Sequence, residues 1–353
     1  MTGATGPVDV LIVDDSPTVR AVVRRLLERA EGIRVVGEAA DGAQAVEQVV
    51  ALRPAVVLMD IEMPVMDGLA ACERIASVRP TPVLVLTSRA NRDHVHTAFE
   101  AMRRGATEVF AKPTEPGGWQ DLAGTLPAAV RAVAAARSQA APVPQPRTER
   151  TASVKSVRPR AVRFVAIGAS TGGPEAVRQL LASLPRILPA TVLVVQHIAP
   201  GFEEGLAEWL GGSLGRDVKV ARAGEAAAEG VVRIAPNGAH LLLDRDGTLR
   251  LDAASPARGG HRPSVDELFL SCVHAHPRET AGVLLTGMGS DGADGLAALH
   301  DAGALTLVQD EASSVVFGMP RAALERGATK IALPPQELGQ VLARCWHGEK
   351  ERA

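Results

Sequence analysis

Residues 162–173 read VRFVAIGASTGG, an apolar run interrupted only by Arg163 that passes directly into small residues and glycines. A short apolar run that ends in glycines is typical of a strand buried in a parallel sheet. A glycine-rich loop after such a strand is typical either of a phosphate-binding turn or of a sharp turn that presents a nucleophile. The residue that distinguishes the two is Ser170, which stands where a dinucleotide-binding loop has its second glycine.

The dinucleotide interpretation fails at two informative positions. When the pattern G-x-G-x-x-G is aligned on Gly168, the side chain of Ser170 would keep the backbone away from a pyrophosphate. The acidic residue expected about 20 residues later is missing, because the next apolar run, VLVVQH, ends in Gln196 and His197. Residues 168–172 fit the pattern G-x-S-x-G instead, in which small neighbours let a strand-to-helix turn expose the serine hydroxyl.

A serine becomes a nucleophile when a neighbouring base removes its proton, and later strand ends offer both a base and an acid. His197 ends what we expect to be the adjacent strand. A carboxylate that orients the imidazole is expected in the loop LLTGMGSDGADG, where Asp291 and Asp294 are both available. The glycines of this loop let backbone amides approach a reacting carbonyl and contribute to an oxyanion hole.

The second half of the chain alternates short apolar runs with helical patterns. This alternation predicts a three-layer α/β/α domain over residues 161–347 with a mostly parallel sheet. One antiparallel excursion is expected around residues 231–251, where LLLDRDGTLRL contains a hairpin-like turn. The expected strands cover residues 162–168, 190–197, 231–236, 240–244, 281–287 and 304–310.

The first half shows the same alternation over residues 8–126. It predicts a doubly wound, five-stranded parallel sheet with helices on both faces. The expected strands cover residues 8–15, 33–39, 55–60, 82–88 and 107–112.

Polar residues end the strands of this first domain, at the sheet edge where ligands collect in parallel α/β folds. Asp14 and Asp15 end the first strand, and Asp60 ends the third. Carboxylates that converge without a counter-charge repel each other, so a divalent cation with oxygen ligands, Mg²⁺, is expected between them. Thr87 and Lys112 end the fourth and fifth strands and would bind phosphoryl oxygens, which makes one carboxylate a phosphoryl acceptor.

The composition changes between the halves and limits the possible partners. Residues 137–160 are rich in Pro, Arg, Ser and Ala and predict a flexible linker. A net charge of −2 without a long basic block argues against nucleic acid and an anionic membrane surface as partners. Three widely spaced cysteines, no signal-peptide pattern and no apolar stretch near the ~20 residues of a membrane span lead us to expect a soluble, cytoplasmic protein.

Four motifs of the first half occur in an informative order: DD at 14–15, MDIEMPVMDG at 59–68, LTS at 86–88 and KP at 112–113. In this respect residues 8–126 resemble the response-regulator receiver family. The resemblance implies that Asp60 is phosphorylated. It further implies that Asp15 and Asp60 bind Mg²⁺ together with the Glu62 carbonyl, that Asp14 supports the site, and that Thr87 and Lys112 sense the phosphoryl group.

One position departs from the receiver pattern. Receivers often carry an aromatic residue three positions before the lysine, but that position is Val109 here, and the aromatic residue is Phe110. The usual aromatic rotamer switch is therefore expected to be absent or rebuilt, whereas phosphate binding is not affected.

Five motifs of the second half also carry a resemblance: GASTGG at 168–173, QHI at 196–198, HRPSVDELF at 261–269, LTGMGSDGADGL at 285–296 and QDEASSVVFGMP at 309–320. They resemble the chemotaxis protein-glutamate methylesterase (CheB) family, whose order of receiver, linker and esterase domain matches the whole chain. The resemblance implies Ser170 as the nucleophile, His197 as the base, Asp291 as the third member, and Thr171 and the Met288 loop at the oxyanion hole.

The same resemblance implies a substrate, partners and regulation. Members of this family hydrolyse glutamyl methyl esters on methyl-accepting chemoreceptors, release methanol, and in many cases deamidate receptor glutamines. A chemotaxis histidine kinase would donate the phosphoryl group, and the receiver would cover the esterase cleft until Asp60 is phosphorylated. The implied esterase needs no cofactor of its own.

Three other functions are compatible with parts of the sequence. The second half would be a non-catalytic, phosphorylation-gated binding module if the Ser, His and Asp residues were not assembled. A nucleotide-binding output domain is disfavoured by Ser170, and a DNA-binding one by the lack of a helix-turn-helix pattern. His240, His261 and Arg262 were further candidates to line the cleft, which the sequence could not separate from structural residues.

Overall fold

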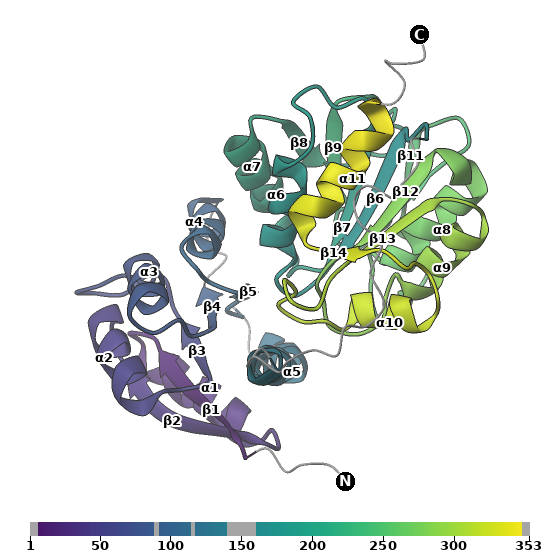
Figure 1. The fold of residues 1–353 in the computed structure, drawn as a ribbon. Coiled ribbons are helices and arrows are strands. Elements are labelled where there is room, and N and C mark those ends of the chain that lie inside the picture. Colours follow the sequence, from purple (N-terminus) through teal and green to yellow (C-terminus); the bar gives the residue numbers. More distant parts are fainter. Residues whose placement is uncertain (1–5, 88–91, 114–116, 140–159, 348–353) are drawn as a thin grey trace. The chain divides into compact units, whose positions relative to one another are not determined.

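The computed structural model describes residues 6–87, 92–113, 117–139 and 160–347, which form two compact units (Figure 1). One unit lies within residues 1–141 and the other within residues 142–353. Each unit has its own parallel sheet and is described by itself below.

The first unit has a five-stranded sheet in the order β2-β1-β3-β4-β5, and all of its pairings are parallel. The predicted doubly wound fold is therefore confirmed, with α1 against α5 and with α2 against α3 on the sheet. Its elements are β1 (Val8–Val13), α1 (Pro17–Glu28), β2 (Ile33–Ala39), α2 (Gly42–Leu52), β3 (Val56–Met59), α3 (Gly68–Val78), β4 (Val83–Thr87), α4 (Arg92–Arg103), β5 (Glu108–Ala111) and α5 (Gly118–Gln139).

Helix α5 is longer than the sequence led us to expect. It runs past residue 126 and includes the first three residues of the predicted linker, 137–139. The segment VRAVAAARSQ that extends it is rich in alanine and arginine, which are strong helix formers. Residues 140–159 of the predicted linker lie outside the described part of the chain.

The second unit has a seven-stranded sheet in the order β14-β13-β12-β6-β7-β9-β8, again with parallel pairings throughout. Helices between the strands complete the predicted α/β fold. Its elements are β6 (Phe164–Ala169), α6 (Gly173–Ala182), β7 (Thr191–Gln196), α7 (Glu203–Leu214), β8 (Asp217–Val220), β9 (Val231–Ile234), β10 (His240–Leu243), β11 (Leu249–Asp252), α8 (Val265–Ala275), the 3₁₀ helix η2 (Pro277–Glu279), β12 (Thr280–Leu284), α9 (Ala293–Asp301), β13 (Leu305–Gln309), α10 (Met319–Glu325), β14 (Ala332–Leu333) and α11 (Pro335–His347).

The antiparallel excursion is smaller than expected around residues 231–251. Strand β9 belongs to the parallel sheet, and only β10 and β11 pair antiparallel, as a separate two-stranded sheet. Strands β8 and β14 were not predicted from the sequence. Both lie at sheet edges, where four and two residues respectively leave too short an apolar pattern to recognise.

The order of strands changes direction at β6. The chain continues from β6 to β7 on one side, whereas β12 and β13 lie on the other side. The loops that leave β6 and β12 therefore diverge at the carboxyl end of the sheet, which is where parallel α/β folds bind ligands.

Two further observations bear on expectations from the sequence. All three cysteines are buried and free, at positions 72, 272 and 345. No helix in the described part of the chain combines the length and the apolar character that a membrane span requires.

Helices α8 and α9 pack closely because Gly295 of α9 has no side chain. A Cβ atom there would lie 2.8 Å from Phe269 Cβ and 3.0 Å from the Asp266 carbonyl oxygen, both of which belong to α8. Backbone and Cβ atoms have no rotamer freedom with which to give way. The glycine therefore sets the distance between the two helices.

We predict that Gly295→Ala destabilises the second unit by about 1–3 kcal/mol, because the added methyl group separates α8 from α9. Denaturant unfolding measures the loss. The matched control is Gly212→Ala in helix α7, where a Cβ would meet no atom within 4 Å. That exchange should be neutral or stabilise by roughly 0.5–1 kcal/mol, and equal losses in both variants would contradict the packing argument.

Candidate active site and phosphoryl-acceptor site

Ser170 directly follows β6 and lies in a tight turn into helix α6. Its amide donates to the Thr286 carbonyl oxygen at 3.0 Å, and its carbonyl oxygen accepts from the Gly173 amide at 2.7 Å. Gly172 has φ +75°, and a Cβ there would lie 2.5 Å from Val315. Glycine is thus required at position 172 both by its backbone conformation and by the space available.

His197 directly follows β7 and lies beside Ser170. Ala169 and Gln196 are register partners in the parallel pair β6 and β7, so Ser170 and His197 are the next residues on neighbouring strands. Neighbouring strands lie about 4.8 Å apart. The Ser170 hydroxyl has no hydrogen bond to His197, which is common in ligand-free sites, where catalytic hydrogen bonds are often long.

The two ring nitrogens of His197 have different surroundings. Nε2 lies 2.9 Å from Asp291 Oδ2. Nδ1 is buried and has no hydrogen-bond partner in the part of the chain that the structure describes. A neutral ring that donates from Nε2 to the carboxylate therefore keeps its lone pair on Nδ1, available to accept a proton.

Asp291 is fixed by hydrogen bonds from two parts of the chain, the residue after β7 and the start of helix α8. Besides His197, its carboxylate accepts from Ser264 Oγ at 2.7 Å, from the Val265 amide at 2.8 Å and from the Asp266 amide at 3.1 Å. These two amides belong to the first turn of helix α8, whose dipole favours a negative charge. Burial alone would raise the pKa of the Asp291 carboxyl, but the hydrogen bonds and the charge of His197 outweigh it and hold the pKa well below its usual range.

Asp294, the other carboxylate of this loop, lies elsewhere. It is exposed on helix α9 and forms an ion pair with Arg326. The geometry therefore brings Asp291, and not Asp294, to the imidazole.

The backbone amides near Ser170 divide into occupied and available donors. The amides of Ser170 and Gly287 donate to the carbonyl oxygens of Thr286 and Val316, each at 3.0 Å. By contrast, the amides of Thr171 and Met288 form no hydrogen bond within the described residues. Of these candidates, Thr171 and Met288 are the ones with free donors for an oxyanion.

Three further residues surround the histidine and its carboxylate, namely His261, His240 and Ser264. The ring of His261 stacks on that of His197, with centroids 3.9 Å apart and planes inclined by 4°. Burial, and then the charge of His197, lower the pKa of His261 and favour its neutral form. His240 accepts from the Ser264 amide at 3.2 Å and so supports a residue that binds Asp291. Ser264 itself was missed, because its partner is 27 residues away in the chain.

Arg262, the third tentative candidate, has a structural environment. Its guanidinium donates to the carbonyl oxygens of Ala253 and Ser255, at 3.1 and 3.0 Å. These contacts tie the loop before α8 to the end of β11 and leave no described contact with the Ser170 region.

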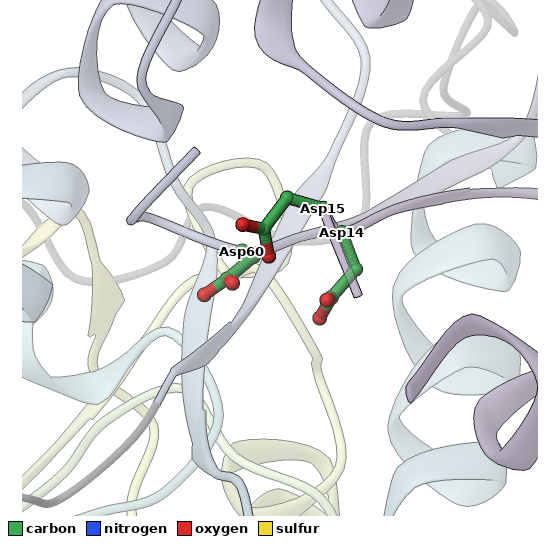
Figure 2. A group of neighbouring side chains, drawn as sticks. All are labelled: Asp14, Asp15 and Asp60. Atoms are coloured by element: carbon green, nitrogen blue, oxygen red, sulfur yellow. The ribbon is translucent and has the colours of Figure 1, made fainter. Parts of the chain in front are cut away.

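The first unit brings its predicted acidic residues together. Asp14 and Asp15 follow β1 and Asp60 follows β3, and one carboxylate oxygen from each lies within 4.8 Å of the others (Figure 2). Thr87 ends β4 and is buried, and Lys112 follows β5. The Lys112 ammonium lies 2.7 Å from Asp14 Oδ2 and 2.6 Å from Asp60 Oδ2.

The electrostatics of this cluster fit a divalent cation. Burial raises the pKa of Asp60, as does the charge of Asp14, against the opposing charge of Lys112. Three carboxylates face one ammonium, so negative charge is in excess, and oxygen donors of this kind suit Mg²⁺. The role expected of the Glu62 carbonyl stays a prediction. Val109, at the position where receivers often carry an aromatic residue, is buried. The aromatic residue of this chain, Phe110, is half-buried and lies on the opposite face of β5, because successive side chains of a strand point to opposite faces.

We predict that Asp291→Ala lowers kcat by about 10³- to 10⁴-fold, because the imidazole loses the group that orients it and stabilises its cation. Ester hydrolysis by purified protein measures this. Asp294→Ala removes a carboxylate from the same loop and should retain kcat within about twofold, since surface ion pairs contribute little. A comparable loss in the Asp294 variant would mean that the structure assigns the wrong carboxylate.

Two family models match the chain: "CheB methylesterase" over residues 165–342 and "Response regulator receiver domain" over residues 10–121. A protein-glutamate methylesterase/protein-glutamine glutaminase of Geobacter metallireducens is 42% identical over 342 residues, which is 95% of this chain and 98% of that protein. One from Symbiobacterium thermophilum is 40% identical over 355 residues, with 96% and 97% coverage. The crystal structure of the Thermotoga maritima CheB methylesterase catalytic domain, 36% identical, matches with a TM-score of 0.50 over 52% of this chain and 97% of that one.

Proposed function

The chain belongs to the CheB methylesterase family, and we propose that it is a phosphorylation-activated serine hydrolase that removes methyl esters from glutamyl residues of chemoreceptors and deamidates their glutamines. The observation that carries the proposal is the hydrogen bond between His197 and Asp291. Ser170 and His197 each follow the last register pair of β6 and β7, Ala169 and Gln196, which supports their acting together. Chemoreceptors as substrates and a histidine kinase as phosphodonor follow from the family and from the receiver domain.

In the proposed acylation step, Ser170 Oγ attacks the ester carbonyl while His197 Nδ1 accepts the hydroxyl proton. Asp291 stays ionised and stabilises the imidazolium that forms. The free amides of Thr171 and Met288 donate to the oxyanion of the tetrahedral intermediate. Collapse of this intermediate breaks the C–O bond, and methanol leaves with the proton from His197.

Deacylation repeats the sequence with water as the nucleophile. His197 accepts a proton from the water, the new oxyanion is held by the same amides, and Ser170 leaves with the proton. The products are the free carboxylate and the original enzyme. A glutamine side chain follows the same course with ammonia as the first leaving group, so the two activities need no separate site.

We propose residues 8–126 as the receiver domain, 137–160 as the linker, whose first three residues continue helix α5, and 161–347 as the catalytic domain. Asp60 accepts the phosphoryl group, whose oxygens the Lys112 ammonium and the Thr87 hydroxyl bind. Asp14, Asp15 and Asp60, with the Glu62 carbonyl, would hold Mg²⁺, which neutralises phosphoryl charge when bound. Phosphorylation then relieves a restraint of the receiver on the esterase.

The main alternative is a non-catalytic, phosphorylation-gated binding module. A binding module has no need of a carboxylate with four donors beside a histidine and a serine. The assembled residues therefore favour catalysis.

We predict that Ser170→Ala abolishes methanol release from methylated receptor membranes, because it removes the attacking oxygen. The matched control is Ser213→Ala at the end of helix α7, where the hydroxyl only donates to the Leu210 carbonyl oxygen. This control should keep the activity of the unaltered protein. Unchanged methanol release by the Ser170 variant would contradict the esterase assignment and favour the binding module.

We predict that Asp60→Asn abolishes the activation of methanol release by a small-molecule phosphodonor with Mg²⁺, because no acyl phosphate can form. Chelation of the metal should have the same effect on the unaltered protein. Asp9→Asn is the control, since this carboxylate lies at the opposite end of β1 and pairs with Arg34. Activation that survives in the Asp60 variant would place the phosphoryl acceptor elsewhere.

A further inference from the structure

Gln196 is the last residue of β7 and stands where a dinucleotide-binding domain has its acid, and the proposed chemistry gives it no role. Its side chain is buried, with 2% of the residue exposed. The amide nitrogen Nε2 donates to two carbonyl oxygens, that of Ser170 at 2.8 Å and that of His197 at 2.9 Å. Both protons of the side-chain amide are therefore used on the two residues that act as nucleophile and base.

These two bonds continue the strand pairing beyond its end. The last backbone bond in the β6–β7 ladder runs from the His197 amide to the Ala169 carbonyl oxygen, at 2.9 Å. Beyond it the chains separate into loops, and backbone bonds no longer hold the next two carbonyl groups together. The Gln196 amide joins these carbonyl groups and so fixes the spacing of the strand ends that carry Ser170 and His197.

The remaining atom of the side chain shows which way the amide is held. Gln196 Oε1 is buried and has no hydrogen-bond partner within the described residues. The reverse orientation would turn this oxygen toward two carbonyl oxygens, which repel it. Leaving Oε1 buried without a donor costs free energy, but the two hydrogen bonds that Nε2 donates oppose this cost and fix the orientation of the amide.

Gly173, in the turn after Ser170, leaves space for the side-chain amide of Gln196. A Cβ at that position would lie 2.1 Å from Gln196 Oε1. The second glycine of STGG is thus required by the amide beneath the turn, whereas Gly172 is required by its positive φ.

We infer that Gln196 is a positioning residue. Its amide donates hydrogen bonds to the backbones of both the nucleophile and the base and so holds Ser170 within reach of His197. The inference rests on the proposed function, because it assumes that these two residues act together. It extends that function by naming the interaction that sets their distance.

The test replaces the two donors without changing the size of the side chain. Gln196→Glu puts a carboxylate, which only accepts, against both carbonyl groups, and Gln196→Met fills the same volume without polar atoms. We expect kcat for methanol release to fall by about 10- to 100-fold in each, because small displacements of reacting groups cost this much, with KM within about threefold. Labelling of Ser170 by a fluorophosphonate should slow by a similar factor.

The pH profile separates positioning from simple packing. In Gln196→Glu the carboxyl regains one donor when it is protonated, so its activity relative to the unaltered protein should rise as the pH falls. Gln196→Met has no titrating group and should show a constant ratio.

Thr329 provides the control. It is also buried, with 5% exposed, and its hydroxyl donates to the carbonyl oxygen of Thr306, near the start of β13, at 2.6 Å. Thr329→Val removes a buried hydrogen bond and should cost unfolding free energy, but it should change kcat less than about threefold.

The outcomes distinguish the two proposals. If the unaltered protein releases no methanol, the proposed function fails. If it does, and the folded Gln196 variants keep its kcat and labelling rate, the positioning role is overturned. Losses of kcat that are equal in the Gln196 variants and in Thr329→Val overturn it as well, because a general loss of stability would then be their cause.

Discussion

The catalytic unit depends on the placement of one buried carboxylate. Asp291 accepts four hydrogen bonds, from the end of β7, from Ser264 and from the first turn of α8. A buried charge is tolerable only when it is paired and hydrogen-bonded, so these elements must come together for Asp291 to remain ionised. The same bonds hold His197 in the tautomer that leaves Nδ1 free. Folding energy and catalytic geometry thus have a common origin.

Helix α8 can approach this carboxylate because the residues that face its first turn are glycines. Val265, whose amide binds Asp291, is fully buried between two glycines. A Cβ at Gly168 would lie 2.1 Å from its Cγ1, and one at Gly292 would lie 2.5 Å from the same atom. Gly287 in turn lies against Ser170, whose Cβ would be 2.8 Å from an added methyl group. The glycines flanking the catalytic residues therefore act mainly by letting β6, α8 and the β12 loop pack closely.

The sequence predicted the parts of this arrangement that follow from local patterns. Continuous apolar runs predicted the central strands. The ends of these strands made Ser170, His197, Asp60 and Lys112 candidates, because parallel strands bring their carboxyl ends to one edge. Local patterns left the choice between Asp291 and Asp294 open, and only the family resemblance favoured Asp291. The two lie in one glycine-rich loop and differ in whether they precede or follow the start of α9, which decides whether the side chain faces α8 or solvent. Gln196 and Ser264 gave no signal, since each binds residues that only the fold brings near.

The two units use buried carboxylates in opposite ways. Asp291 is ionised, and its carboxylate accepts four hydrogen bonds. In the receiver, three carboxylates share the single ammonium of Lys112, and that lysine already contacts two of them. A phosphoryl group on Asp60 would add further negative charge and three acceptor oxygens to this cluster. The added charge would therefore act on the cluster that already has an excess of negative charge, whereas Asp291 already accepts four hydrogen bonds.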